Sequence, residues 1–137
     1  MLVGLHACLK PPSYPITPAL TFDSVTPDSC HQTTDTVVFK INFTDGDGDL
    51  GVKQGENTAD FFMTDSRTGF VYSNLIPFVE PIGNIKAISG NFTYSTVLSC
   101  RPNHPGFDTT SYSIYIVDRA GHQSNTVTTP PIVLKCN

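Results

Sequence analysis

The acidic run at residues 45–51 is the part of the chain whose residue types and spacing point most directly to chemistry. Asp45, Asp47 and Asp49 stand at alternate positions, and the residues between them are glycines. Three neighbouring carboxylates repel one another and gain nothing from packing. A cation that neutralises them would keep them together, and ligands that are all oxygen suit a hard ion such as Ca²⁺.

The residues after this run extend the resemblance to a calcium loop but break its spacing. Glu56 is the twelfth residue counted from Asp45, where an EF-hand loop has its last carboxylate, but Leu50 takes the sixth position, which that loop gives to glycine. Residues 36–43 alternate between polar and apolar and predict a strand, so the loop is not flanked by helices. We predict a calcium site formed by Asp45, Asp47, Asp49 and Glu56. The alternative is a polar β-turn, since Asp-Gly pairs favour hairpins.

The rest of the chain predicts the strands that would position these residues. Strand-like runs recur at short intervals between turn signals, and no segment shows the helical period of 3.6. About seven short strands with this spacing predict an all-β fold, an antiparallel immunoglobulin-like β-sandwich. The runs are residues 19–25, 36–43, 60–64, 70–76, 86–98, 112–117 and 125–134.

In such a sandwich the loop at residues 45–56 and the hairpin at 118–122 lie at one end. Asp118 is therefore a candidate additional metal ligand, with the alternative that it only stabilises its own turn. The same counting brings Cys30, Cys100 and Cys136 together at the opposite end, where all three pairings stay open. We expect a Cys100–Cys136 disulfide, because it would hold the C-terminus in place.

Size and charge exclude several classes of function. A chain of 137 residues fits one domain, which we assign to residues 19–137, and a net charge of −4 without a basic stripe argues against a nucleic-acid partner. The four histidines are scattered and there is no Gly-x-Ser-x-Gly motif. We therefore predict no catalytic residues and no enzymatic activity.

The N-terminus predicts a membrane anchor. Residues 1–8 are apolar and end in Leu5-x-Ala7-Cys8, which resembles the box at which a bacterial lipoprotein signal is cut and its cysteine acylated. We predict acylation of Cys8. Residues 9–18 contain four prolines, and this composition is typical of an extended, semi-rigid tether.

Several segments together resemble small Bacteroidota-type cell-envelope lipoproteins of unassigned function. They are residues 43–51, 65–72, 85–90 and 115–125, and the resemblance covers nearly the whole chain, Cys8 included. It implies export and a lipid anchor, and it implies no reaction.

These observations predict a lipid-anchored, non-enzymatic structural or accessory subunit that docks on a larger outer-membrane or cell-envelope complex and is stabilised by Ca²⁺. It would face the periplasm or the cell surface, with exposed aromatic residues such as Phe61, Phe62, Tyr72 and Phe78 as its docking face. The alternative is a calcium-dependent surface glycan-binding module, which needs exposed coplanar rings near one face.

Overall fold

The computed structural model of the chain describes residues 10–137, which form an all-β fold. These residues contain ten strands and no helix, so this part of the chain offers no helix able to cross a membrane. The strands are β1 (Ala19–Thr26), β2 (Ser29–His31), β3 (Thr36–Asp45), β4 (Phe61–Asp65), β5 (Val71–Asn74), β6 (Ile88–Val97), β7 (Gly106–Thr110), β8 (Tyr112–Ile116), β9 (Val127–Thr128) and β10 (Ile132–Cys136).

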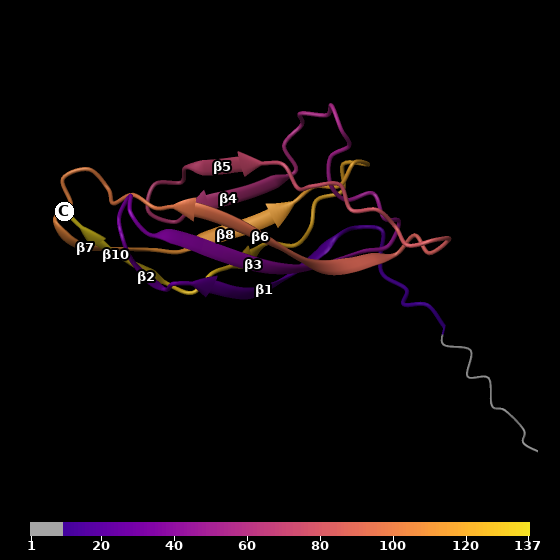
Figure 1. Cartoon of the computed structure of the whole chain (residues 1–137), viewed down its shortest axis with the longest axis horizontal. Helices are drawn as coiled ribbons and strands as arrows, with labels where there is room; N and C mark the ends of the chain where they lie inside the picture. The colour runs from indigo at the N-terminus through magenta and orange to yellow at the C-terminus, as the bar shows by residue number, and fades with distance from the viewer. Residues whose placement is uncertain (1–9) are drawn as a thin grey trace, which may run out of the picture.

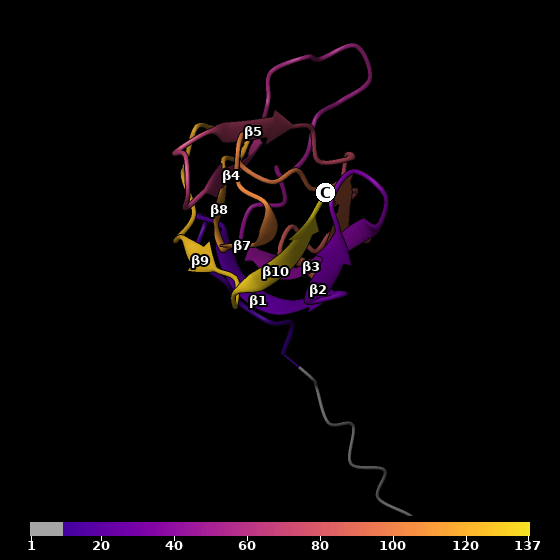
Figure 2. The same ribbon diagram turned by 90° about the vertical axis from the view of Figure 1, so that its left-hand side faces the viewer.

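The strands form three sheets, of order β1-β3-β6, β5-β4-β8-β9 and β2-β10-β7. All neighbouring strands are antiparallel except β2 and β10, which are parallel. The first two sheets face each other, with β4, β5 and β8 above β1 and β3 in Figure 1, and the small third sheet lies at the end that carries the C-terminus (Figures 1 and 2). Across the interface, the rings of Phe39 and Tyr112 meet edge to face at 5.5 Å.

The period-two pattern of β3 and β8 builds the core and also leads to the acidic residues. In β3 every second side chain from Val37 to Phe43 is buried, and Asp45 occupies the next inward position with no exposed surface. In β8 the alternate residues from Tyr112 to Ile116 are buried, and Asp118 continues the same alternation. Because side chains alternate between the two faces of a strand, both aspartates lie at the end of the core.

The all-β class agrees with the sequence prediction, whereas the number of strands does not. The predicted strand at residues 125–134 is divided into β9 and β10, because Pro130 and Pro131 have no amide N–H for a ladder. Two further strands, β2 and β7, lie in segments that the sequence analysis did not predict to be strands. Both pair with β10, a long-range contact that their own residues do not encode.

Of the four aromatic side chains that were predicted to be exposed on a docking face, Phe61 is not exposed. Phe61 is buried in the core at 2% exposure, whereas Phe78 is 41% exposed. Phe62 and Tyr72 are half-buried. The predicted signal remnant at residues 1–8, with Cys8, lies outside the described residues.

Candidate metal centre

The loop after β3 and the hairpin after β8 meet at the end of the fold opposite the C-terminus (Figure 1). Two contacts join them at Asp49: its carbonyl oxygen accepts the Arg119 amide at 3.2 Å, and its Oδ2 accepts the Ala120 amide at 3.1 Å. The hairpin is thereby held against the acidic run, which brings Asp118 to it.

Four carboxylates come together there, and we call them the acidic cluster: Asp45, Asp47, Asp49 and Asp118. Taking one carboxylate oxygen from each residue gives a set of four oxygens that all lie within 4.8 Å of one another. Asp118 therefore lies beside the run, as expected, and its role as a metal ligand stays a prediction. Asp118 also stabilises its own turn, since its Oδ1 accepts the His122 amide at 2.8 Å.

Part of the cluster's hydrogen-bonding capacity is unused. The Oδ1 atoms of Asp45, Asp47 and Asp49 are buried, and none has a hydrogen-bond partner among residues 10–137. The other oxygen of Asp45 accepts the Asp49 amide at 3.0 Å, so this carboxylate is held in place while Oδ1 stays free. Buried polar atoms are rarely left without a partner, and a metal ion is one group that satisfies such oxygens.

Two of the carboxylates, Asp45 and Asp49, bind a proton more tightly than a free carboxylate does. Burial first, and then the charges of Asp47 and Asp49, raise the pKa of Asp45 to about 6. Burial, followed by the charges of Asp118 and Asp47, also raises the pKa of Asp49. Ionising Asp45 and Asp49 is therefore costly unless a cation joins them.

The nearest basic side chains leave this charge only partly compensated. Arg119 donates from Nη1 to the carbonyl oxygens of Leu50 at 3.2 Å and Gly51 at 2.7 Å, and its guanidinium lies 4.9 Å from the Phe78 ring centre. His122 Nδ1 lies 2.8 Å from Asp118 Oδ2, and this hydrogen bond raises the pKa of His122. The imidazole is thus hydrogen-bonded to Asp118 and to no other carboxylate of the cluster.

Glycine is required between the carboxylates because other segments pack directly against the loop. A Cβ atom on Gly46 would overlap the carbonyl oxygens of Tyr14 and Pro15, and the Gly46 amide donates to Pro15 at 2.8 Å. Gly48 has a φ of +69°, and a Cβ there would overlap the Lys86 carbonyl oxygen. The alternation of Asp and Gly therefore reflects both charge and close packing.

The structure does not bring Glu56 to the acidic cluster. Leu50 is fully buried in the core, and Gly51 then turns the chain with a φ of +84°. Glu56 closes a separate turn, in which its Oε2 accepts the Lys53 amide at 2.8 Å. The EF-hand spacing therefore does not describe this loop, and the fourth carboxylate comes from Asp118 on another strand.

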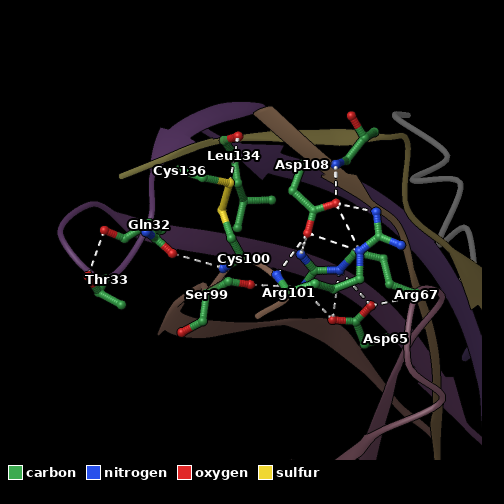
Figure 3. Close-up of a disulfide and its surroundings, with 11 residues drawn as sticks. Gln32, Thr33, Asp65, Arg67, Ser99, Cys100, Arg101, Asp108, Leu134 and Cys136 are labelled. Carbon is green, nitrogen blue, oxygen red and sulfur yellow. Dashed lines mark hydrogen bonds and ion pairs between the residues drawn. A yellow bond between two sulfur atoms is a disulfide. The ribbon is translucent and has the colours of Figure 1, made fainter. Parts of the chain in front are cut away.

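The predicted disulfide at the opposite end is present. Cys100 and Cys136 are bonded, with their Cα atoms 6.0 Å apart (Figure 3). Cys30 is a buried free thiol. Bridging β10 to the segment after β6 holds the C-terminal strand in place.

An ion-pair network that the sequence prediction missed lies beside this disulfide (Figure 3). Arg67 joins Asp65 at 2.6 Å and Asp108 at 2.7 Å, and Arg101 pairs with Asp108 at 2.8 Å. Burial alone would raise the pKa of Asp108, but the hydrogen bonds from Arg101 and Arg67 outweigh it and hold that pKa well below its usual range. No sequence motif marks these residues, which come from three places along the chain: the turn at residues 65–67, Arg101 and Asp108.

No protein-family model, curated protein or solved structure matches this chain.

Proposed function

We propose that this chain is a lipid-anchored, non-enzymatic accessory subunit of a larger outer-membrane or cell-envelope complex. In this proposal, one Ca²⁺ bound by the acidic cluster ties together one end of an immunoglobulin-like β-sandwich. The observation that carries the calcium part of the proposal is the group of buried Oδ1 atoms of Asp45, Asp47 and Asp49 that lack hydrogen-bond partners within the described part of the chain.

The donor set favours Ca²⁺ over other ions. All four side chains offer carboxylate oxygens, and Ca²⁺ takes six to eight oxygen ligands in flexible geometry, so that backbone carbonyls or water would complete the shell. Mg²⁺ requires a tighter octahedron and retains its waters. An ion shared by Asp45 at the end of β3 and Asp118 after β8 would link the two facing sheets, which is a structural role.

Sequence features support the membrane and compartment parts of the proposal. Leu5-x-Ala7-Cys8 followed by the proline-rich residues 9–18 fits an acylated cysteine on a stiff tether. The Cys100–Cys136 disulfide suits an oxidising compartment such as a bacterial periplasm or cell surface.

The aromatic side chains favour an accessory subunit over a glycan-binding module. A sugar platform needs ring faces that are open to solvent. Phe62 and Tyr115 form a parallel pair near the acidic end, but their rings stack on each other at 4.9 Å with 15° between their planes, and each covers a face of the other. Exposed apolar residues gather instead in the segment after β5, which contains Phe78, Ile82 and Ile85.

Calorimetric titration tests the calcium site. We expect one Ca²⁺ per chain, an affinity at least about tenfold weaker after Asp47→Asn, and weak competition by Mg²⁺. Asp28→Asn is the matched control, because Asp28 is exposed and precedes β2 at the opposite end. If the wild-type protein took up no calcium at millimolar concentration, the acidic run would be only a polar turn.

Fractionation of native cells tests the anchor and the partner. Acylated protein should start at Cys8, carry the added mass of the lipid and co-migrate with a larger complex after detergent extraction. Two or more acyl chains give stable membrane binding, so Cys8→Ser should release the chain to the soluble fraction. Recovery of an intact peptide across residues 5–10 from native membranes would refute acylation.

A further inference from the structure

A surface cavity of about 440 Å³ lies beside the acidic cluster and extends away from it. It is enclosed by the loop that leads into β4 and by the hairpin after β8, and it shares Asp118 with the cluster. Its volume is within the range that accommodates a small ligand or one long side chain. The residues that line it include Val52, Glu56, Ala59, Asp60, Val117 and Ala120.

Asp60 is the polar group built into this cavity. Only 7% of this residue is exposed, and Oδ1 accepts the Ile76 amide at 2.6 Å, which fixes the orientation of the carboxylate. Its Oδ2 is buried without a hydrogen-bond partner among the residues that the structure describes. The Asp60 backbone is also fixed, because its amide donates to Asn74 at 3.1 Å and its carbonyl oxygen accepts the Val117 amide at 2.9 Å.

The charge around the cavity is unbalanced. Glu56, Asp60 and Asp118 contribute three carboxylates, and Arg119 is the one basic side chain that lines the described cavity. Arg119 is already engaged, since Nη1 donates to two backbone carbonyls and the guanidinium lies against Phe78. An occupant that brings hydrogen-bond donors and positive charge would therefore be favoured.

The remaining walls suit an aliphatic stem. The side chains of Val52, Ala59, Val117 and Ala120 line the cavity with apolar surface. Lysine and arginine side chains combine such a stem with a charged end that carries several donors, and they bury the stem along apolar surface.

We propose that this cavity binds an ammonium or guanidinium group on an aliphatic stem, attracted by the negative charge of the Asp60 carboxylate buried in its wall. A lysine or arginine side chain is the natural source of such a group. That the group belongs to a partner protein rests on the proposed function, whereas the recognition of the group rests only on the cavity and Asp60.

Amide NMR titration of the full chain with n-butylammonium, in saturating Ca²⁺ and again in chelator, tests the proposal. We expect saturable shifts at residues 58–60 and 117–121 in both conditions. Uncharged n-butanol, which has the same stem, should bind at least tenfold more weakly. A separate titration with Ca²⁺ alone tests the calcium site through shifts at residues 45–49. Either proposal can therefore be refuted without the other.

Two variants locate the site. Asp60→Asn removes the charge and should weaken n-butylammonium binding at least tenfold, with Asp28→Asn as the control that leaves it unchanged. Ala120→Leu adds bulk at an exposed residue of the cavity wall and should weaken it as well, which keeps the test valid if Asp60→Asn does not fold.

Three results would overturn the proposal. Equal binding of n-butanol would show a cavity that does not select charge. Shifts confined to residues 45–49 and lost in Ca²⁺ would show that the amine is only a counterion of the acidic cluster. Binding of methyl glucoside at residues 117–121 without any response to n-butylammonium would instead favour the glycan-binding alternative.

Discussion

Replacing Asp45 with asparagine should have opposite effects on stability with and without calcium. Asp45 is fully buried, and burial together with the charges of Asp47 and Asp49 raises its pKa to about 6 from the usual 3.8. Asparagine keeps an oxygen that can accept the Asp49 amide, and its NH₂ group can donate to the neighbouring carboxylates. In chelator, the variant therefore loses a repulsion and gains hydrogen bonds.

The sign of the pH dependence follows from the direction of this shift. The folded state holds the Asp45 proton more tightly than the unfolded chain does, so in chelator the stability should fall as pH rises from about 4 to about 6. At about 1.4 kcal/mol for each tenfold change in proton affinity, ionisation of Asp45 costs about 3 kcal/mol of folding free energy. In chelator at pH 7.5, Asp45→Asn should be more stable than wild type by up to that amount.

Calcium should reverse the comparison. An ion that binds only the folded state adds RT ln(1 + [L]/Kd), about 2.7 kcal/mol at a hundredfold excess over Kd, and wild type should show this gain. Asp45→Asn lacks one charged ligand and should gain much less. For 137 residues, 1 kcal/mol corresponds to about 3–4 °C in Tm, so each difference approaches about 10 °C.

Thermal unfolding followed by circular dichroism, from pH 4 to pH 8 in 1 mM Ca²⁺ and in chelator, measures these differences. Asp28→Asn should stay within about 0.5 kcal/mol of wild type throughout, as is usual for an exposed position. A raised proton affinity of Asp45 is refuted if Asp45→Asn is no more stable than wild type in chelator at pH 7.5, or if wild type does not lose stability between pH 4 and pH 6.5.

Three other perturbations probe the rest of the fold. Gly46→Ala should force the N-terminal segment off the acidic loop, lower stability by about 1–3 kcal/mol and speed proteolytic cleavage near residue 15, and unchanged cleavage would contradict that packing. Arg67→Met removes the guanidinium that joins two buried carboxylates and leaves Asp65 without a cationic partner, so it should cost about 3–5 kcal/mol in urea unfolding, whereas Arg101→Met should cost less because that side chain is 43% exposed. Reducing the disulfide, which closes a loop with a separation of 36 residues, should cost about 4 kcal/mol, and peptide mapping that found Cys30 in the bridge would contradict the assignment.

Local features of the sequence were sufficient to predict the all-β class and three of the four residues of the acidic cluster. Alternation of apolar residues is a property of each strand by itself, so β3 and β8 could be read without knowing their neighbours. Asp45, Asp47 and Asp49 were predictable for the same reason, because adjacent charges repel wherever the chain places them. Glu56 was wrongly joined to them, since counting residues assumes a loop path that the burial of Leu50 changes.

The remaining features depended on contacts between distant residues. Asp118 reaches the cluster because β3 and β8 lie in facing sheets and both carry their inward alternation to the same end. The choice of Cys136 as the partner of Cys100 was decided by the pairing of β10 with β2 and β7, and the cavity at Asp60 by the loop that folds over it. Sequence by itself determined which residues carry charge and which positions alternate, because these are properties of the chain. Only the tertiary structure decided which charges meet, because burial and proximity arise from long-range packing.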